Sequence, residues 1–148
     1  MGNRRKAREV SLQLLYETEL AHKSGREVTE RFLKDPHGLQ FETGELDADA
    51  LQEVKDFTRL ILEGVANNVR EIDSLMESHS THWKVSRMAS VDRNILRMAI
   101  FELLYCSDIP ASVTINEAIE IAKKYGTEES GAFVNGILDH IAKALKKI

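Results

Sequence analysis

The sequence predicts an all-α protein, an irregular bundle of about six to seven helices. Apolar residues recur every three or four positions along most of the chain, and no segment shows the period of two that is typical of strands. Glycine (8) and proline (2) are scarce in 148 residues, whereas all-β folds need many turns. The length and the 43% of hydrophobic residues suit a single domain over residues 1–148.

In the N-terminal half the periodicity predicts three helical segments. Residues 5–22 form the first helix, and residues 27–34 form a short second one before a loop at 35–44. Asp47 is a good N-cap for the third segment. Its apolar residues repeat as far as Met76, so it is either one long helix or two helices broken near Asn67 and Asn68.

In the C-terminal half the predictions rest on helix-end signals. Ser90 is expected to cap a helix that ends before Pro110, because proline does not continue a helix. The pattern from Thr114 to Glu117 is that of a capping box and predicts the start of the next helix. Gly126 then serves as a left-handed cap. Thr127 is expected to cap the last helix, with Glu128 and Glu129 in its first turn and Gly136 in close packing.

Cysteine usage and the N-terminus indicate a cytoplasmic protein. The lone Cys106 has no partner for an internal disulfide, and we interpret it as a core or boundary residue. The apolar stretch after the basic N-terminus is broken by Gln13, Glu17 and Glu19, so neither a signal peptide nor a membrane span is expected.

Charge is distributed unevenly along a chain whose net charge is −4. Residues 1–8 contain Arg4, Arg5, Lys6 and Arg8 and no acidic residue. Without these four, 16 basic residues face 24 acidic ones, a net charge of −8. A basic end on an acidic body binds phosphates locally, but a solvated charge run explains the same pattern, and the spacing does not separate the two.

No pattern supports an active site, a metal site or a cofactor. The phosphate-binding and dinucleotide-binding glycine motifs and the nucleophile-elbow motif are absent. His79 and His82 lie three residues apart, but two histidines without a third ligand are better explained as exposed polar residues near a helix end. We therefore expect no catalytic residues, no metal and no cofactor, and a protein that acts by binding.

Three aromatic or charged positions favour contact with nucleic acid. Arg5 and Tyr16 are eleven residues apart, about three helical turns, so they point the same way and offer a cation beside a stacking surface. The alternative is that Tyr16 extends the core stripe. Phe133 is expected to be partly exposed near the start of the last helix, beside Glu129, where backbone N–H groups favour anions.

Three segments together resemble the NusB family of bacterial transcription antitermination factors, and the resemblance covers nearly the whole chain. They are R-R-K-A-R-E-V-S-L-Q-L-L-Y-E at 4–17, W-K-V-S-R-M-A-S-V-D-R-N-I-L-R-M-A-I-F-E-L-L at 83–104 and D-I-P-A-S-V-T-I-N-E-A-I-E-I-A-K-K-Y-G-T-E-E-S-G-A-F-V-N-G-I-L-D at 108–139. Residues 23–50 carry little of the resemblance.

The resemblance implies binding of the single-stranded boxA element of nascent ribosomal RNA together with the ribosomal protein NusE. NusA, NusG and RNA polymerase are then indirect partners, no membrane is involved, and both a monomer and a homodimer are compatible with it. It implies a protein contact at Asp92, and its implied RNA contacts are Arg4, Arg5, Lys6, Arg8, Tyr16, Glu129 and Phe133.

Three other functions compete with this interpretation. One is a protein scaffold whose basic end is idle, and another is the NusB-like domain of a truncated RNA cytosine methyltransferase. A helix-turn-helix DNA binder needs a basic recognition helix, whereas the segment after Ser90 combines Arg93 and Arg97 with Asp92 and Glu102. Binding to single-stranded RNA and to duplex DNA separates these alternatives.

Overall fold

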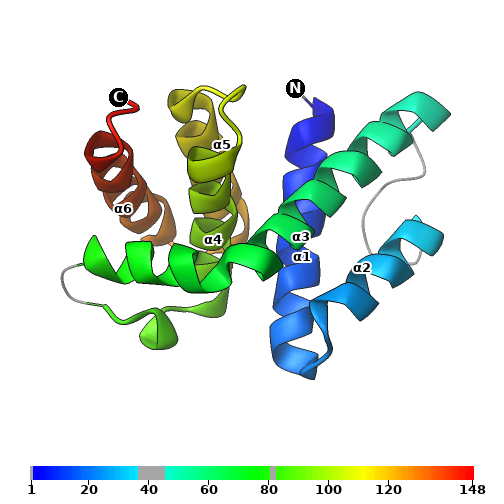
Figure 1. Cartoon of the computed structure of the whole chain (residues 1–148), viewed down its shortest axis with the longest axis horizontal. Helices are drawn as coiled ribbons and strands as arrows, with labels where there is room; N and C mark the ends of the chain where they lie inside the picture. The colour runs from blue at the N-terminus through cyan, green and yellow to red at the C-terminus, as the bar shows by residue number, and fades with distance from the viewer. Residues whose placement is uncertain (1, 37–45, 81–82) are drawn as a thin grey trace. The chain divides into compact units, whose positions relative to one another are not determined.

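The computed structural model describes residues 2–36, 46–80 and 83–148, and the predicted all-α class is confirmed. Within these ranges the elements are six α-helices and a 3-10 helix, with no strand (Figure 1). Contacts between α-carbons group the chain into two compact units, Met1–Ala66 and Asn67–Ile148. The single domain over residues 1–148 stays a prediction.

The first unit contains α1, α2 and the first part of α3, with bounds Gly2–Ala21, Gly25–Lys34 and, for the whole of α3, Ala48–Ser78. The Ser24 side chain caps α2 by accepting the Glu27 N–H at 3.1 Å, so this helix begins earlier than predicted. Asp47 caps α3 as predicted, because its Oδ1 accepts the Ala50 N–H at 2.7 Å.

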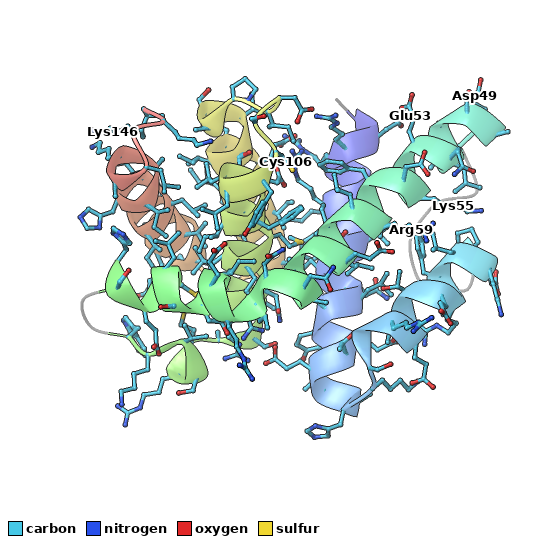
Figure 2. All side chains as sticks on the ribbon, viewed as in Figure 1. Asp49, Glu53, Lys55, Arg59, Cys106 and Lys146 are labelled. Atoms are coloured by element: carbon cyan, nitrogen blue, oxygen red, sulfur yellow. The ribbon has the colours of Figure 1, made fainter. Side chains whose placement is uncertain are left out.

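Apolar side chains join α1 and α2, and a buried hydroxyl joins α1 and α3. Leu14 of α1 is fully buried and Phe32 of α2 is 1% exposed. The Thr58 hydroxyl of α3 donates to the Ala7 carbonyl at 3.4 Å, which satisfies a polar group that is fully buried. Arg59, the next residue of α3, is about 100° further round the helix and is exposed (Figure 2).

Helix α3 is interrupted at one residue. Asn68 has φ −126° and ψ 17°, outside the helical region, and helical residues precede and follow it. The sequence left open one long helix or two helices broken near Asn67 and Asn68, and the structure has two helical segments that meet at a kink at Asn68.

The second unit consists of the last part of α3, the 3-10 helix η2 (Val85–Arg87) and three helices that pack on one another. These are α4 (Ser90–Tyr105), α5 (Ala111–Tyr125) and α6 (Ser130–Ala144), which lie side by side (Figure 1). Cys106, directly after α4, is 6% exposed, as expected for a core residue. Large core side chains that are fully buried include Ile72, Met76, Ile95, Leu96, Ile100, Leu138 and Ile141.

Two predicted helix starts lie inside their helices. Ser90 is the first residue of α4, and its carbonyl accepts a hydrogen bond from the Asn94 amide at 2.9 Å. The predicted capping box was wrong, because α5 begins directly after Pro110, whose fixed φ suits a helix start. The hydroxyl of buried Thr114 instead donates to the carboxylate of buried Glu102 at 3.0 Å.

The turn before α6 is closed by Ser130 and not by Thr127. The helix begins at Ser130, and its hydroxyl accepts the Thr127 N–H at 2.9 Å. Glu128 and Glu129 therefore precede the helix and do not form its first turn. A serine hydroxyl reaches back to this N–H because the Ser130 N–H donates to the Thr127 carbonyl at 3.1 Å and folds the turn.

The structure corrects both glycine predictions. Gly126 has φ −93°, so it is not a left-handed cap. A Cβ at this position would lie 2.6 Å from the Ser130 Cβ and 2.8 Å from the Ala122 carbonyl oxygen, and close approach is the reason for glycine. Gly136 is exposed, and a Cβ there would meet nothing within 4 Å, so close packing does not explain it.

We predict that Gly136→Ala raises the free energy of unfolding by about 1 kcal/mol, because alanine lowers the entropic cost of the helix interior without a clash. Gly126→Ala is the matched control and is expected to lower it by about 1–3 kcal/mol, because its Cβ displaces Ser130. Urea unfolding of both variants measures these changes. Destabilisation by Gly136→Ala would contradict the assignment of open space around this residue.

Candidate functional site

The basic end of α1 presents its four cations at different depths. Arg4 and Arg5 are exposed, Lys6 is half-buried and Arg8 is only 4% exposed. Successive residues of a helix are about 100° apart, so these side chains surround the axis and do not form one flat patch. Arg4 and Arg5 therefore provide most of the positive charge that is accessible at this end of α1.

Phe57 of α3 organises one side of this basic end. The guanidinium of Arg4 lies 4.9 Å from the centroid of its ring and that of Arg8 lies 5.2 Å from it. The two arginines are one helical turn apart, and each cation–π contact contributes about 0.5–2 kcal/mol. Arg8 thus has a packing role, and a buried guanidinium fits the predicted phosphate contact less well than the exposed Arg4 and Arg5.

Tyr16 lies at the surface of the first unit. Its side chain is 39% exposed, three turns along α1 from Arg5, so it does not simply extend the core stripe. An ion pair between Glu17 of α1 and Arg31 of α2, with an N–O distance of 2.6 Å, fixes the neighbouring part of the helix. Tyr16 and Arg5 provide the predicted combination of an aromatic ring and a cation on one helix.

The start of α6 carries the two predicted contacts of the second unit. Glu129 occupies the N-cap and is exposed, and its carbonyl accepts the Phe133 N–H at 3.1 Å. Phe133 is half-buried, as expected from its place near the helix start.

Trp83 was not predicted as a functional residue, and it lies against Phe133. The ring centroids are 6.4 Å apart and the planes meet at 82°, an edge-to-face arrangement. The indole is 51% exposed. The sequence suggested only a connection over residues 83–89, although a lone tryptophan beside Lys84 in a surface connection is the signal that identifies it.

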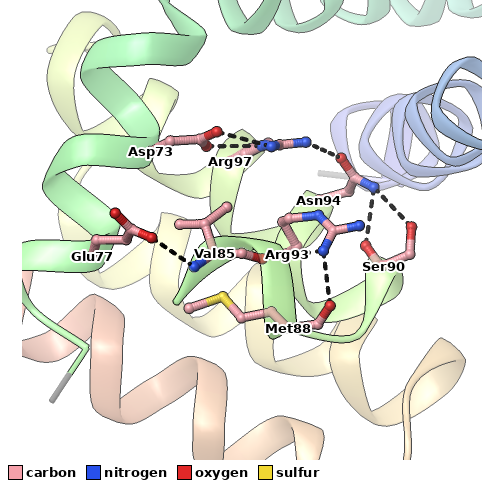
Figure 3. Close-up of polar contacts among 8 residues, drawn as sticks. All are labelled: Asp73, Glu77, Val85, Met88, Ser90, Arg93, Asn94 and Arg97. Atoms are coloured by element: carbon pink, nitrogen blue, oxygen red, sulfur yellow. Dashed lines mark hydrogen bonds and ion pairs between the residues drawn. The ribbon is translucent and has the colours of Figure 1, made fainter. Parts of the chain in front are cut away.

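Residues 83–89 are held by Arg93 of α4 (Figure 3). Its guanidinium donates to the carbonyls of Val85 at 3.1 Å and Met88 at 2.8 Å. The Val85 N–H donates to Glu77 of α3 at 3.0 Å, and both Val85 and Met88 are buried. Burial, and secondarily the nearby charge of Arg97, lowers the pKa of Arg93, which nevertheless stays charged in proteins.

Arg97, one turn further along α4, ties this helix to α3. Its guanidinium makes two parallel hydrogen bonds of 2.9 Å to Asp73, and both side chains are largely shielded from solvent (Figure 3). It also donates to the side-chain oxygen Oδ1 of Asn94 at 3.3 Å, while the side-chain amide nitrogen of Asn94 donates to the Ser90 carbonyl. The segment V-D-R-N therefore contains two residues, Arg93 and Asn94, that serve the fold.

Asp92 differs from these neighbours. It lies in the first turn of α4, where a carboxylate suits the helix dipole. Its Oδ1 is buried and has no hydrogen-bond partner among the residues that the structure describes. A buried carboxylate oxygen normally has a donor, so within the described part of the chain this oxygen of Asp92 has unused bonding capacity.

His79 pairs with His140 of α6, a contact that the sequence did not reveal. The Nδ1 atoms are 2.9 Å apart and the ring centroids 4.7 Å apart. One ring must donate and the other accept, so double protonation breaks the bond. Burial, followed by the charge of His140, lowers the pKa of His79. His82, the other histidine of the predicted pair, lies outside the described residues.

Across residues 2–36, 46–80 and 83–148, no group of three or more histidine, cysteine, aspartate or glutamate residues could hold a metal ion. No helix in the described part of the chain is long and apolar enough to cross a membrane.

Comparison with known proteins relates nearly the whole chain to one family. The model of the NusB family matches residues 5–143. The transcription antitermination protein NusB of Myxococcus xanthus is 46% identical over 147 residues, which cover 99% of each chain. NusB of Geotalea uraniireducens is 46% identical over 146 residues, 98% of this chain and 97% of that protein.

Solved structures show the same similarity. T. maritima NusB superposes with a TM-score of 0.75 at 38% sequence identity, covering 95% of this chain and 90% of the other. A chain from a complex of the antitermination factors NusB and NusE with double-stranded RNA gives a TM-score of 0.76 at 27% identity, covering 97% and 98%.

We predict that the histidine pair makes stability depend on pH. Because the pKa of His79 is lower in the folded state than its unfolded value of about 6.5, the unfolded chain binds the proton more readily. The free energy of unfolding should fall as pH decreases from about 6.5 towards the folded pKa. His79→Gln should flatten this dependence, whereas His22→Gln, at an exposed position after α1, should not. Urea unfolding across this pH range measures both, and equal slopes in wild type and His79→Gln would contradict the role of the pair.

Proposed function

This chain belongs to the NusB family of transcription antitermination proteins, and on that premise we propose that it binds the boxA element of nascent ribosomal RNA together with NusE. The observation that carries the proposal is similarity over nearly the whole length, both to antitermination proteins and to the NusB of a NusB–NusE complex with RNA. The partners beyond this pair are NusA, NusG and RNA polymerase, reached through the assembled complex.

The electrostatics of α1 support a phosphate contact. The chain carries a net charge of −4, yet residues 1–8 hold four cations and no acid, and Arg4 and Arg5 are exposed. Phosphate neutralisation releases counterions, so a few such contacts give a modest affinity that falls as salt rises. A protein partner that adds RNA-binding surface is consistent with this modest affinity.

Exposed aromatic rings support contacts to unpaired bases. Tyr16 is 39% exposed in the first unit, and Phe133 is half-buried in the second. Unstacked bases of single-stranded RNA stack on such rings, and each stacked base contributes about 1–3 kcal/mol. Glu129 is placed at the N-cap of the helix that carries Phe133, where its carboxylate is able to accept hydrogen bonds from base amino groups or sugar hydroxyls.

We assign Asp92 to the contact with NusE. The support is the buried Oδ1 without a hydrogen-bond donor among the described residues, on a helix whose other polar groups serve the fold. A hydrogen-bond donor from a protein partner would satisfy this oxygen and contribute about 1.5–3 kcal/mol to the binding free energy.

We further propose that residues 1–148 act as one binding domain, in the cytoplasm where nascent RNA is made, and without catalysis. The relatives are named as antitermination proteins, and the described residues contain no metal-ligand cluster. Calorimetric titrations with nucleotides and divalent metal ions test this, since stoichiometric binding of either would contradict it.

The decisive experiment is a titration of the chain with a boxA-type single-stranded RNA, in the presence and absence of NusE. The proposal expects binding that NusE strengthens. The RNA of the related NusB–NusE complex is double-stranded, so the same sequence as a duplex is a necessary second ligand. Absence of RNA binding with NusE present would favour the scaffold alternative, and preference for duplex DNA would favour the DNA-binding one.

We predict that Arg5→Ala weakens RNA binding and leaves the fold intact, because an exposed guanidinium is lost from the basic end of α1. Loss of one phosphate contact should reduce the slope of log affinity against log salt by about 0.7 for single-stranded RNA. Arg26→Ala, which removes an exposed arginine of α2, is the matched control and should change neither quantity. Unaltered affinity and salt slope in Arg5→Ala would exclude this contact.

Arg8→Ala is expected to behave differently. Because Arg8 is buried over Phe57, its removal should also lower the free energy of unfolding, so its RNA affinity has to be measured on protein shown to be folded.

We predict that Asp92→Asn weakens NusE binding by about 10- to 150-fold, the equivalent of ~1.5–3 kcal/mol, and leaves binding of RNA by the free chain unchanged. Asp49→Asn is the matched control, because Asp49 is also an acid in the first turn of its helix, α3, so both variants lose the same favourable dipole interaction. Calorimetric titration with NusE measures the effect. If both variants bound NusE with equal affinity, Asp92 would not be part of the NusE interface.

A further inference from the structure

Trp83 is a large aromatic surface that the fold leaves uncovered. It is the single tryptophan of the chain, and 51% of it is exposed. Aromatic rings such as indole contribute a large apolar area when they are buried, and here about half of that area is available to another molecule.

The contact between Trp83 and Phe133 covers little of the two ring faces. In an edge-to-face pair one ring directs its edge at one face of the other, so at least three of the four ring faces are not covered by the pair itself. The planes meet at 82°, so flat ligands on the two rings would be almost perpendicular to each other. Consecutive bases of a regular helix are parallel, whereas unstacked bases of a single strand adopt such an angle freely.

Trp83 is also held close to an anchored backbone. Two residues later, buried Val85 donates its N–H to Glu77 and accepts a hydrogen bond from Arg93 (Figure 3). This anchoring reduces the conformational entropy that binding would otherwise remove.

The charges beside Trp83 suit a polyanion. Lys84 and Arg87 follow it in the same connection, and both side chains are exposed. The carboxylate of Glu77 already accepts the Val85 N–H. A stacking ring flanked by exposed cations is the combination that single-stranded nucleic acid binders use.

We propose that Trp83 is a second stacking platform, which binds an unpaired base of the same RNA strand that contacts Phe133, with Lys84 and Arg87 on its phosphates. The proposal rests on the proposed RNA-binding function and extends it to residues 83–87. The perpendicular rings hold two bases in unstacked orientations, and this arrangement selects single-stranded RNA over a duplex. The other candidate occupant is an apolar side chain of a protein partner, and the test separates the two.

The indole provides its own reporter, because it is the only tryptophan of the chain. A boxA-type RNA is titrated into the full chain while indole fluorescence is followed. The titration is done once without NusE and once with a NusE variant that contains no tryptophan. Base stacking on Trp83 should quench the fluorescence at saturation. The quenching should persist in Phe133→Ala at higher RNA concentration, because a direct contact does not depend on the neighbouring ring, whereas a role only in positioning Phe133 would abolish it.

Affinities of three variants complete the test. Trp83→Ala should weaken RNA binding by about 5- to 150-fold, the equivalent of ~1–3 kcal/mol per stacked base, and Trp83→Phe should retain most of the affinity. Leu60→Ala, which removes another exposed apolar side chain in the first unit, should have no effect. Urea unfolding checks that all three are folded.

The outcomes distinguish the two proposals. If wild type binds no RNA even with NusE, the proposed function fails and this inference fails with it. If wild type binds and Arg5→Ala weakens binding, while Trp83→Ala does not and fluorescence is unchanged, only the second platform is overturned. Loss of NusE affinity in Trp83→Ala with normal RNA affinity would assign the surface to the protein partner.

Discussion

Two arginines one turn apart on α4 satisfy the polar groups on which the second unit depends. The connection before α4 contains the carbonyls of two buried residues, and buried carbonyls without donors are costly. Arg93 supplies donors to both of them, at Val85 and Met88, and Arg97 binds Asp73 through two hydrogen bonds of 2.9 Å. Arginine suits both tasks because its planar fork has five donors and keeps its charge when shielded from solvent.

This arrangement has a consequence for function. Because Val85 is fixed, the chain just before it presents Trp83 against Phe133 of α6, and a connection becomes a surface with defined shape. Loops carry binding residues when a rigid scaffold positions them. The same helix that supplies the two arginines carries Asp92, whose Oδ1 has no donor in the described part of the chain. Residues that serve the fold thus stand beside an aspartate with unused bonding capacity in one short segment.

Buried polar groups also explain where the helix-end predictions failed. A threonine followed by a glutamate three residues later is a good capping box, but Thr114 and Glu117 are 2% and 5% exposed and lie inside α5. The Thr114 hydroxyl binds Glu102 of α4, a partner twelve residues away, in preference to a local backbone N–H. A local sequence pattern shows which hydrogen bonds a side chain is able to make, and the tertiary packing decides which of them forms.

The sequence alone determined the helical class, the cap at Asp47, the basic N-terminus with Arg5 and the family, because periodicity, capping chemistry and motif order are local properties. Only the tertiary structure showed that Arg8 is buried over Phe57, that Gly126 is required by the approach of Ser130, that His79 meets His140, and that Trp83 lies on Phe133. Each of these facts depends on which side chains a helix meets from elsewhere in the chain. A periodic pattern states which side of a helix is buried, but it carries no information about the neighbour that buries it.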